Sequence, residues 1–457
     1  MSFSSYPADE ESGIEWIGSI PKWWKLAPIK ALATCNDDVL DEMTPPDQKI
    51  HYVEISDVDA VRGIRASTEL AFGISPSRAR RCVQHGDVIV STVRTYLRAI
   101  APVLHPPPTM IVSTGFAVFR PRKAIPGFLA YVFQAEFMIA SIISKSVGVS
   151  YPAVNASDIG HIKIPVPPLA EQQAIADFLD RETAKINDLI IQQERLLLLI
   201  EEKLQAIISL AVTNGLDPST QDVGDNIAGL ENAPRKWKTQ RVRHFVEKIE
   251  QGWSPQCDGY PVSSTDEWGV LKVGCVNGGI FDPRENKSLP PALEPIPDLG
   301  LRVDDVLVSR ANTRDLVGSC ALVENDHPRL ILCDKLYRVR FRKASIVPAF
   351  FVLYMRSSLA RQEIERQASG ASYSMLNIGQ DVILNLSIPL PSVKQQEAIV
   401  EYVNKHRRAS WTLSNQVKSA IALLRERRAG LISAAVTGEI DVRNVVRKTV
   451  ADEAVAA

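Results

Sequence analysis

The sequence predicts an α+β protein in which two domains alternate with two long helices. Three observations support this prediction. The chain has 457 residues, which is too long for a single hydrophobic core. It repeats itself at an offset close to half its length, and a long run of periodic apolar residues follows each copy of a proline-rich segment. The expected fold is therefore a pseudo-twofold internal repeat.

The two proline-rich segments are near copies. Residues 165–175 read Pro-Val-Pro-Pro-Leu-Ala-Glu-Gln-Gln-Ala-Ile, and residues 389–399, which begin 224 positions later, read Pro-Leu-Pro-Ser-Val-Lys-Gln-Gln-Glu-Ala-Ile. Proline is tolerated in the first turn of a helix but not in its interior. Each segment therefore predicts the end of an extended stretch and the start of a helix.

Behind each start, apolar residues recur at steps of four and three, which is heptad spacing with polar interruptions. The first run is Ile175, Leu179, Glu182, Ile186, Leu189, Gln193, Leu196, Ile200, Lys203, Ile207 and Leu210. The second is Ile399, Val403, His406, Ser410, Leu413, Val417, Ala420, Leu424, Arg427, Leu431 and Ala434. Each helix would have roughly 44 residues and a length of about 65 Å. Two copies of equal length and phase bury their apolar stripes on each other more simply than each on its own domain. Asn214, Gly215 and Gly438 suit a left-handed helix stop.

The two non-helical parts have ordinary domain sizes of roughly 150 residues. Short β-branched runs are broken by Gly, Pro, Asn and Asp, with a few helices such as one around residues 128–144. This pattern favours a twisted sheet that is mostly antiparallel or mixed. Trp24 and Trp237, in matching opening segments, are expected to anchor the cores or the domain–helix joint. The expected boundaries are 1–167 for the first domain, 168–215 for the first long helix, 216–233 for a linker, 234–390 for the second domain, 391–438 for the second long helix and 439–457 for a tail.

Composition sets limits on function. The formal net charge is −1, so bulk charge gives no support for nucleic-acid binding, and any such role must rest on local clusters. The six cysteines are scattered without a C-x-x-C pair, which is typical of buried thiols in a reducing compartment. The acidic start lacks an apolar core of a signal peptide, and apolar stretches such as 196–200 are too short to cross a membrane. A cytoplasmic location is expected.

Motifs for catalysis are missing. The sequence has no G-x-x-x-x-G-K-[ST] loop and no Asn-Pro-Pro-Tyr segment of adenine methyltransferases. The triplet at 201–203 (Glu-Glu-Lys) resembles a nuclease E-x-K only faintly, and a solvated helix face explains it better. The histidines show no metal-ligand spacing. We therefore expect a non-catalytic chain that binds no metal or cofactor.

Local clusters of basic residues supply candidates for DNA contact. Arg78, Arg80 and Arg81 form a compact basic loop before the strand expected at 86–91, and such a loop suits phosphate positioning or is simply a solvated surface. Side chains that follow a buried strand are well held and well presented. Arginine can bond guanine, and asparagine adenine, in a fork. The candidates after the two equivalent strands are Arg94, Tyr96, Arg98, Arg310, Asn312 and Arg314. Ion pairs within the domain are the alternative role for these residues.

Two further loops match each other, Gly-Val-Ser-Tyr at 148–151 and Gly-Ala-Ser-Tyr at 370–373. They add small residues for close backbone approach and an aromatic ring, and a lysine precedes the first loop. They either contact DNA or form tight turns that lead into the helix caps at Asn155 and Asn377. The candidates here are Lys145, Ser150, Tyr151, Ser372 and Tyr373.

With its tandem of variable domain, Pro-Pro-Leu-x-Glu-Gln-Gln helix, second variable domain and second such helix, the chain resembles the specificity subunit of type I restriction–modification enzymes. The opening Gly-Ile-Glu-Trp-Ile-Gly-Ser-Ile-Pro-Lys-Trp-Trp at 13–24 is similar to the usual N-terminal segment of this family. The resemblance covers nearly the whole chain except the first few residues and the tail after about residue 442. Two departures are a weak second opening at 229–238 and Lys-Gln-Gln at 394–396, where the first copy has Ala-Glu-Gln.

The resemblance implies two target-recognition domains, each of which reads one half of a split DNA sequence, and two long helices that form an antiparallel coiled coil between them. It also implies the partners, which are double-stranded DNA, two modification subunits and restriction subunits, without a membrane. Modification subunits methylate adenine N6 with S-adenosylmethionine, and the restriction subunit is a motor and nuclease that uses ATP and Mg. The specificity chain itself binds no cofactor. A rigid spacer between two DNA-reading modules makes half-site spacing a geometric property.

Other functions remain open. A self-sufficient methyltransferase–nuclease is disfavoured by the missing cofactor motifs. A DNA-independent coiled-coil adaptor would keep the helices but need no DNA selectivity. A methylation-only system would use the same chain without a restriction subunit.

Overall fold

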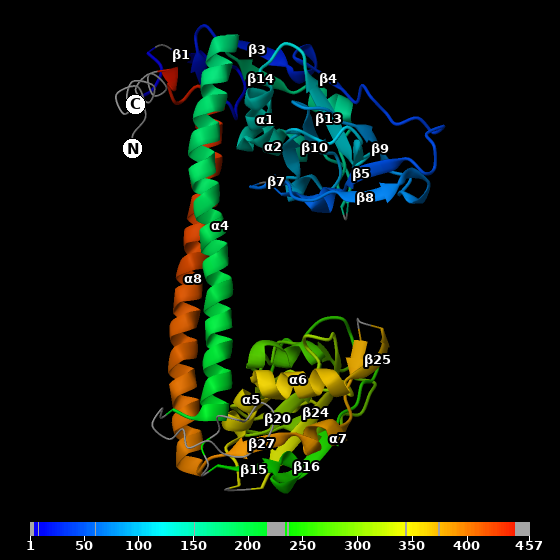
Figure 1. Cartoon of the computed structure of the whole chain (residues 1–457), viewed down its shortest axis with the longest axis vertical. Helices are drawn as coiled ribbons and strands as arrows, with labels where there is room; N and C mark the ends of the chain where they lie inside the picture. The colour runs from blue at the N-terminus through cyan, green and yellow to red at the C-terminus, as the bar shows by residue number, and fades with distance from the viewer. Residues whose placement is uncertain are drawn as a thin grey trace. The chain divides into compact units, whose positions relative to one another are not determined.

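The computed structural model describes residues 4–7, 9–59, 61–149, 151–216, 234, 237–342, 345–372 and 375–443, with the backbone alone at 371 and 372 (Figure 1). Contacts divide the chain into two compact units. Unit 1 contains Met1–Arg195 and Val417–Ala457, and unit 2 contains Leu196–Gln416. Each unit therefore combines one non-helical domain with segments of both long helices. The expected domain boundaries stay a prediction, because the linker after residue 216 and the tail after residue 443 lie outside the described residues.

Unit 1 is built on two four-stranded sheets. The first is antiparallel, in the order β11 (Ile100–Pro102), β10 (Val88–Ser91), β13 (Phe116–Pro121) and β4 (Ala33–Cys35). The second has the order β8 (Thr68–Ala71), β5 (Lys49–Val53), β12 (Met110–Ser113) and β9 (Ala79–Cys82), with β5 and β12 parallel. Three two-stranded pairs complete the unit: β1 (Asp9–Glu11) with β2 (Ser19–Pro21), β3 (Lys25–Pro28) with β14 (Lys163–Val166), and β6 (Val58–Asp59) with β7 (Gly63–Ile64).

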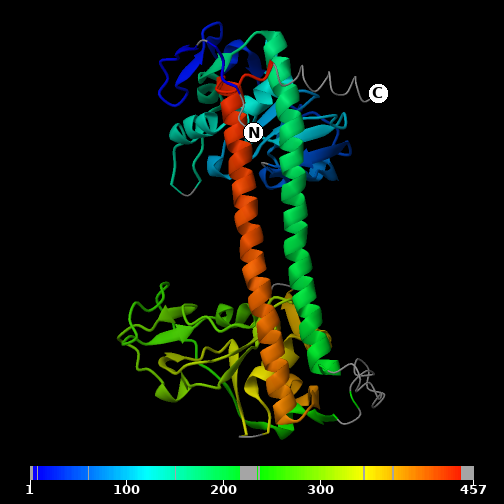
Figure 2. The same cartoon turned by 90° about the vertical axis from the view of Figure 1, so that its left-hand side faces the viewer.

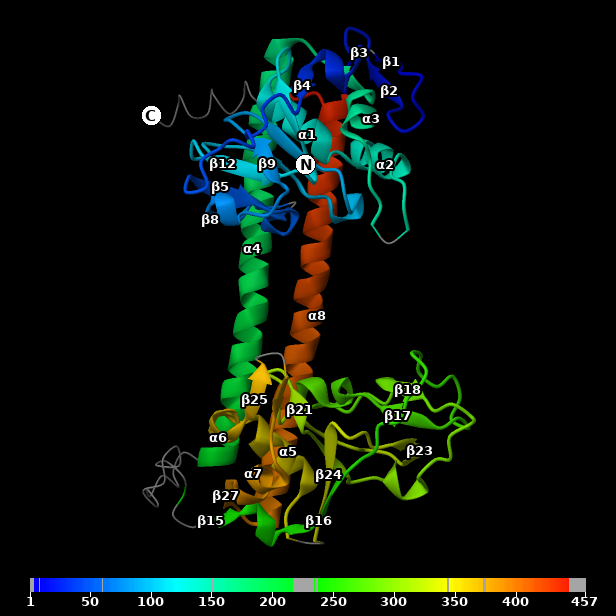
Figure 3. The same ribbon diagram turned by 90° about the vertical axis from the view of Figure 1, so that its right-hand side faces the viewer.

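Unit 2 repeats this topology, and Figure 3 labels most of its strands. Its antiparallel sheet has the order β16 (Val246–Gln251), β24 (Leu336–Phe341), β20 (Val306–Ser309) and β22 (Cys320–Leu322). Its mixed sheet has the order β18 (Asn286–Ser288), β17 (Gly269–Leu271), β23 (His327–Ile331) and β19 (Gly300–Leu301), with β17 and β23 parallel. β15 (Lys238–Arg241) pairs with β27 (Ser387–Leu390) as β3 pairs with β14. The predicted internal repeat and mixed sheets are confirmed.

The helices also correspond between the units. Unit 1 has α1 (Pro126–Gln134), α2 (Glu136–Ser144) and α3 (Ala156–Gly160), and unit 2 has α5 (Pro348–Arg356), α6 (Ser358–Gln367) and α7 (Gln380–Asn385). The long helices are α4 (Leu169–Asn214) and α8 (Val393–Thr437). Within unit 1 the end of α8 lies beside the start of α4, as Figure 2 shows, where Arg428 Nε donates to Asn187 Oδ1 at 3.0 Å. The helices run antiparallel, so the predicted coiled coil is confirmed.

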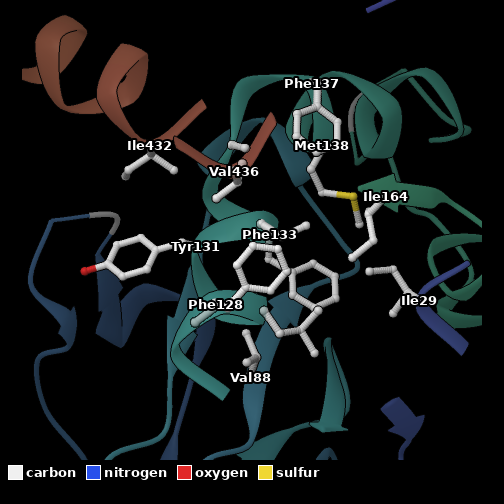
Figure 4. Packing of buried hydrophobic residues seen from close by; sticks show 14 of the residues in the cluster. Ile29, Val88, Phe128, Tyr131, Phe133, Phe137, Met138, Ile164, Ile432 and Val436 are labelled. Carbon is white, nitrogen blue, oxygen red and sulfur yellow. The ribbon is translucent and has the colours of Figure 1, made fainter. Parts of the chain in front are cut away.

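Each domain core includes side chains from both long helices. In unit 1 the core contains Ile175 and Leu179 from α4 together with Ile432 and Val436 from α8. Figure 4 shows these two α8 residues near the aromatic side chains of α1. The core of unit 2 contains the residues at the same offset of 224 in the other helix, which are Ile399, Val403, Ile208 and Val212. The main core of each domain is therefore shared with both helices, while a second cluster in each unit, around Val112 and around Leu307, contains no residue of the long helices.

One buried glutamine fixes each long helix to its domain. Gln172, which is 1% exposed, accepts a hydrogen bond from Ile125 N at 2.9 Å and donates to Pro167 O at 2.9 Å. Its counterpart Gln396, also 1% exposed, accepts from Val347 N at 2.8 Å and donates to Pro391 O at 2.9 Å. Ile125 and Val347 are the N-cap residues of α1 and α5. The repeated Gln-Gln of the sequence therefore contains one structural glutamine per unit.

The predicted left-handed helix stops are confirmed. Gly215 follows α4 with φ +80° and Gly438 follows α8 with φ +85°. A Cβ at Gly438 would lie 2.4 Å from Pro21 Cδ, and a Cβ at Gly215 would lie 3.1 Å from a ring carbon of Trp237. Trp24 and Trp237 are buried in the cores of their units, as expected.

The buried face of the long helices differs from the predicted heptad stripe. Leu189, expected inside, is 45% exposed, whereas Ile190 is buried; Lys203 and Leu204 show the same one-residue shift. Buried residues instead keep phase from Ile175 to Ile208 and from Ile399 to Ile432, which is three eleven-residue periods in each helix. An eleven-residue repeat has about 3.67 residues per turn, closer to the 3.6 of an α-helix than the heptad is. The predicted heptad stripe is therefore wrong at positions such as Leu189 and Lys203, whereas Ile186, Ile200 and Val417 are buried as it predicts.

A buried ion pair recurs in both antiparallel sheets. Arg120 on β13 donates from Nε and one Nη to Asp87 at 2.9 Å each, and Asp87 is fully buried. Arg340 on β24 makes the same fork to Asp305 at 2.6 and 3.1 Å. The Arg120 pair raises the pKa of that guanidinium, first through the hydrogen bond to Asp87, so the pair stays charged.

No single helix among the described residues is long and apolar enough to cross a membrane. The pair α1 and α2, bent by 63°, meets the criteria of length and composition only. Most residues of both helices are buried in the core of unit 1.

We predict that Gln172→Ala and Gln396→Ala each lower the free energy of unfolding of their own unit by about 1–3 kcal/mol, because a buried N–H and a buried carbonyl lose their partners. Urea unfolding of the full chain, followed by circular dichroism, measures this. Gln173→Ala is the matched control. Its exposed amide bonds only Asp177, so the change should stay within about 0.5 kcal/mol. Equal midpoints for all variants would contradict a stabilising role.

We also predict that Arg120→Ala destabilises unit 1 by about 3–5 kcal/mol, because it leaves Asp87 buried without its partner. Arg122 follows the end of β13 and makes a partly exposed ion pair with Asp37. Arg122→Ala removes this pair and should lower the free energy of unfolding by less than about 1 kcal/mol. Differential scanning calorimetry of the two variants gives the comparison. Similar losses of stability in the two variants would show that the buried ion pair stabilises the unit no more than the exposed pair does.

Candidate nucleic-acid interface

In unit 1 the loop after β10 and the loop after α2 lie against each other. Arg94 N donates to Pro152 O at 2.8 Å, Val154 N donates to Thr92 O at 2.9 Å, and Val93 forms a bridge with Ala153. The structure therefore brings together two of the sequence-predicted loops, 92–98 and 147–153.

Arg94 and Tyr151 form the centre of this surface. Arg94 has a left-handed backbone, with φ 51° and ψ 48°. Its guanidinium carbon lies 4.7 Å from the centroid of the Tyr151 ring. Both side chains are exposed, and Arg94 has no carboxylate partner among the described residues. A charged fork held over an aromatic face is free to bond a base edge or a phosphate.

The neighbours of Arg94 divide into free and paired residues. Tyr96 is 53% exposed and Lys145, the C-cap of α2, is also exposed. Arg98, predicted as a DNA contact, donates from both terminal nitrogens to Glu136, at 2.5 and 3.1 Å. Because both partners of this pair are nearly half exposed, the ion pair is weak and can exchange for a phosphate.

The basic segment 75–81 borders the same edge, but the predicted loop ends at Arg78, because Arg80 and Arg81 lie on β9. Thr114 N donates to Arg78 O at 2.8 Å, and the next residue, Gly115, accepts from Thr92 N at 2.8 Å. Arg78 itself donates to Glu54 at 2.7 Å and to the Tyr52 hydroxyl at 3.2 Å. Arg80 lies over the Phe72 ring at 4.8 Å, so Arg78 and Arg80 both have partners within the domain. Arg81 has a buried Nε without a partner among the described residues.

Unit 2 presents the equivalent edge in a different form. β21 (Ala311–Asn312), β26 (Met375–Asn377) and β25 (Ser369–Ser372) form a three-stranded sheet, so the loops 310–314 and 369–377 also come together. Ile378 N donates to Arg310 O at 3.0 Å. Each unit therefore joins a strand-end loop to the loop that precedes a short helix.

The predicted residues of this edge are held differently from those of unit 1. Arg310 is half-buried and donates to Asp334 O at 3.4 Å. Asn312 accepts from Thr313 N at 2.9 Å, while its buried Nδ2 has no partner among the described residues. Arg314 is exposed, with Glu365 at 3.9 Å. Ser150 and Tyr373 lie outside the described residues, and of Ser372 only the backbone is described. Direct contact of all these residues with DNA stays a prediction.

Sequence reasoning missed a lysine at this edge. Lys335 is exposed, and its carbonyl accepts from Arg310 N at 2.8 Å, where unit 1 has Gly115 in the same role. Nearby, Ser254 bonds the Asp334 side chain and Trp253 N donates to Leu332 O. In the sequence Lys335 lies between Asp334 and Leu336 and belongs to no cluster of basic residues. Its position beside Arg310 could not be predicted locally, because it depends on the pairing of β24 with β20.

The described residues contain no group of three or more His, Cys, Asp or Glu side chains placed to hold a metal ion. All six cysteines are free thiols, and burial raises the pKa of Cys35 and Cys333 to about 11. The surface described above can form hydrogen bonds, ion pairs and stacking contacts.

Comparison with known proteins agrees with these features. A family model described as type I restriction modification DNA specificity domain matches residues 82–197, which include the 92–98 and 147–153 loops and the start of α4. The specificity subunit of the type I restriction enzyme EcoKI from Escherichia coli strain K12 is 23% identical over 93% of this chain and 90% of its own length. That of EcoEI from Escherichia coli is 28% identical over 41% of this chain, a match that spans 32% of that relative.

A chain from a solved structure on complex assembly and conformational transition of the type I R-M system has the same fold. It superposes with a TM-score of 0.67 at 23% identity, covering 92% of this chain and 99% of that one. The sequence comparisons and the fold comparison thus point to the same group of proteins. Residues 82–197 therefore match a type I restriction–modification DNA specificity domain, and the chain as a whole is similar to the specificity subunits of these enzymes.

Proposed function

We propose that this chain is the DNA-recognition subunit of a type I restriction–modification complex, and that each of its two domains reads one half of a bipartite target. The observation that carries this proposal is the repeated interface. The same two loops meet at the same strand end in both units, but the side chains differ, with Arg94 where unit 2 has Asn312. Arginine pairs with guanine and asparagine with adenine, so one scaffold offers two different readings.

Within each interface we assign separate roles. Arg94 contacts a base edge, since its backbone is fixed by the partner loop and its side chain is exposed. Asn312 contacts a base edge in unit 2 after its side chain turns to expose the buried Nδ2. Arg78, Arg98, Lys145 and Arg314 contact phosphates, because they are exposed and at most weakly paired. Phosphate contacts position the protein without reading sequence. Tyr96 and Tyr151 add aromatic surface beside Arg94.

The long helices supply the spacer and the docking surface for modification subunits. Each helix is continuous, with 46 residues in α4 and 45 in α8. Large apolar side chains remain exposed on both helices, among them Leu198 at 58%, Trp411 at 69% and Leu423 at 65%. Exposed apolar surface of this kind favours a protein partner. Adenine N6 methylation and DNA cleavage, with their cofactors S-adenosylmethionine, ATP and Mg, then belong to partner subunits.

A DNA-independent adaptor would need the helices and their apolar surface alone. The exposed arginines and tyrosines gathered at one edge of unit 1 favour the DNA-reading role. A methylation-only system differs in its partners and not in this chain.

We predict that cells that express this chain with its modification subunit acquire N6-methyladenine in a split motif with a fixed spacer. Exchange of residues 1–164 for those of a relative should change one half-site only, because each domain reads its own half. Methylome sequencing measures both outcomes. Complexes that assemble without new methylation would support the adaptor role.

We predict that Arg94→Asn lowers DNA affinity by about 10- to 100-fold and relaxes the half-site read by the first domain, as expected for loss of a forked contact of 1–3 kcal/mol. Asparagine tolerates the left-handed backbone, so the loop should stay folded. Filter binding of the assembled complex gives the affinity. Arg122→Asn is the matched control, because Arg122 is half exposed and follows the C-terminal end of β13. Equal losses in both variants would argue against base contact by Arg94.

A further inference from the structure

Unit 2 contains a cavity of about 200 Å³ that no DNA-reading loop uses. Its walls are α5, residues 400–407 of α8 and the loops around 279–283 and 322–327. Most of the lining is apolar, including Phe281, Leu322 and Val352. Two arginines, Arg356 and Arg407, complete it.

Neither arginine has a hydrogen-bond or ion-pair partner for its guanidinium among the described residues. Arg356 is the last residue of α5, and its side chain packs on Gly279, where a Cβ would lie 2.7 Å from its Cδ and one Nη. Glycine at this position, with φ +75°, gives the guanidinium its space. Burial lowers the pKa of Arg356, Glu201 opposes this shift, and the like charge of Arg407 adds to it.

Two unpaired guanidiniums in a partly desolvated cavity destabilise the protein unless a negative group joins them. Five N–H donors on each arginine suit a tetrahedral oxyanion, which can accept two bonds from each fork. Asn404, Asn325 and His327 also line the cavity and can donate hydrogen bonds. Glu324 is the single carboxylate of the lining.

Unit 1 provides an internal comparison. Its corresponding cavity, of about 440 Å³, has Gln134, Asp180 and Thr183 where unit 2 has Arg356, Asn404 and Arg407. These groups are satisfied internally, since the Tyr131 hydroxyl donates to Asp180 at 2.7 Å and lies 3.0 Å from the Thr183 hydroxyl.

The buried arginine of that cavity is also satisfied. Arg428 donates to Asn187 at 3.0 Å and to Gln134 at 2.8 Å. The repeat thus keeps the cavity in both units but leaves excess positive charge without a partner only in unit 2.

We propose that the cavity of unit 2 binds an oxyanion of the phosphate class between Arg356 and Arg407. Its volume admits inorganic phosphate or a small phosphomonoester. An anion held there joins the end of α5 to α8, and so stabilises the junction between the second domain and the long helices. This site is separate from the loops proposed to read DNA.

The test is thermal unfolding of the full chain in inorganic phosphate and in chloride at equal ionic strength. Phosphate should raise the Tm of the wild type, because a ligand bound only to the folded state stabilises it. Arg356→Gln and Arg407→Gln should abolish the increase or move its half-saturating concentration up at least about ten-fold. Arg428→Gln in unit 1 is the matched control and should keep the full response to phosphate.

Phosphorus NMR of inorganic phosphate gives a second readout on variants whose circular dichroism matches the wild type. Line broadening by the wild-type chain, lost in Arg356→Gln, supports the site. The proposal is overturned if phosphate acts no better than chloride on the wild type, or if folded Arg356→Gln and Arg407→Gln respond as the wild type does.

A DNA binding measurement separates the two sources of phosphate. If a DNA backbone phosphate occupies the cavity, inorganic phosphate competes with DNA, and Arg356→Gln weakens binding to all sequences and lowers the salt slope by about one. If free phosphate occupies it, DNA affinity is unchanged by Arg356→Gln while the thermal response is lost. Both outcomes support an oxyanion site at Arg356.

Discussion

The rest of the structure depends on the burial of both long helices in each domain core. Ile175 and Ile432 belong to one core, and their counterparts Ile399 and Ile208 belong to the other. The buried glutamines Gln172 and Gln396 then fix where each helix begins relative to α1 and α5. The core around α1 or α5 is thus shared between domain and helices, while a second cluster lies within each domain alone.

On this shared scaffold the two units differ mainly in their polar side chains. The fork of Arg120 to Asp87 and that of Arg340 to Asp305 are the same structural device, and the order of strands is the same. Differences between the units include the strand-end loops and the cavities beside the helices. The residues proposed to read DNA are thus separate from the ion pairs and glutamines that hold the fold.

Much of the fold followed from the sequence, because the repeat, the proline-rich helix starts and the glycine stops act locally. The phase of the long helices followed only in part: Ile200 is buried as predicted, whereas only packing selects Ile190 and Leu204 over Leu189 and Lys203. In the candidate site, Arg94 and Tyr151 were each predicted as DNA contacts, but their meeting depends on the pairing of two loops far apart in sequence. The Arg98–Glu136 pair and the position of Lys335 depend on tertiary contacts between segments far apart in sequence.

The eleven-residue period of burial restricts how such a chain can change in length. Insertion of eleven residues adds three nearly complete turns and about 16.5 Å of helix, so every buried side chain returns to its side. An insertion of five residues rotates the following segment by about 140°, which would expose the residues that complete the domain core. Lengthening of either helix is therefore tolerated only in discrete steps of about eleven residues.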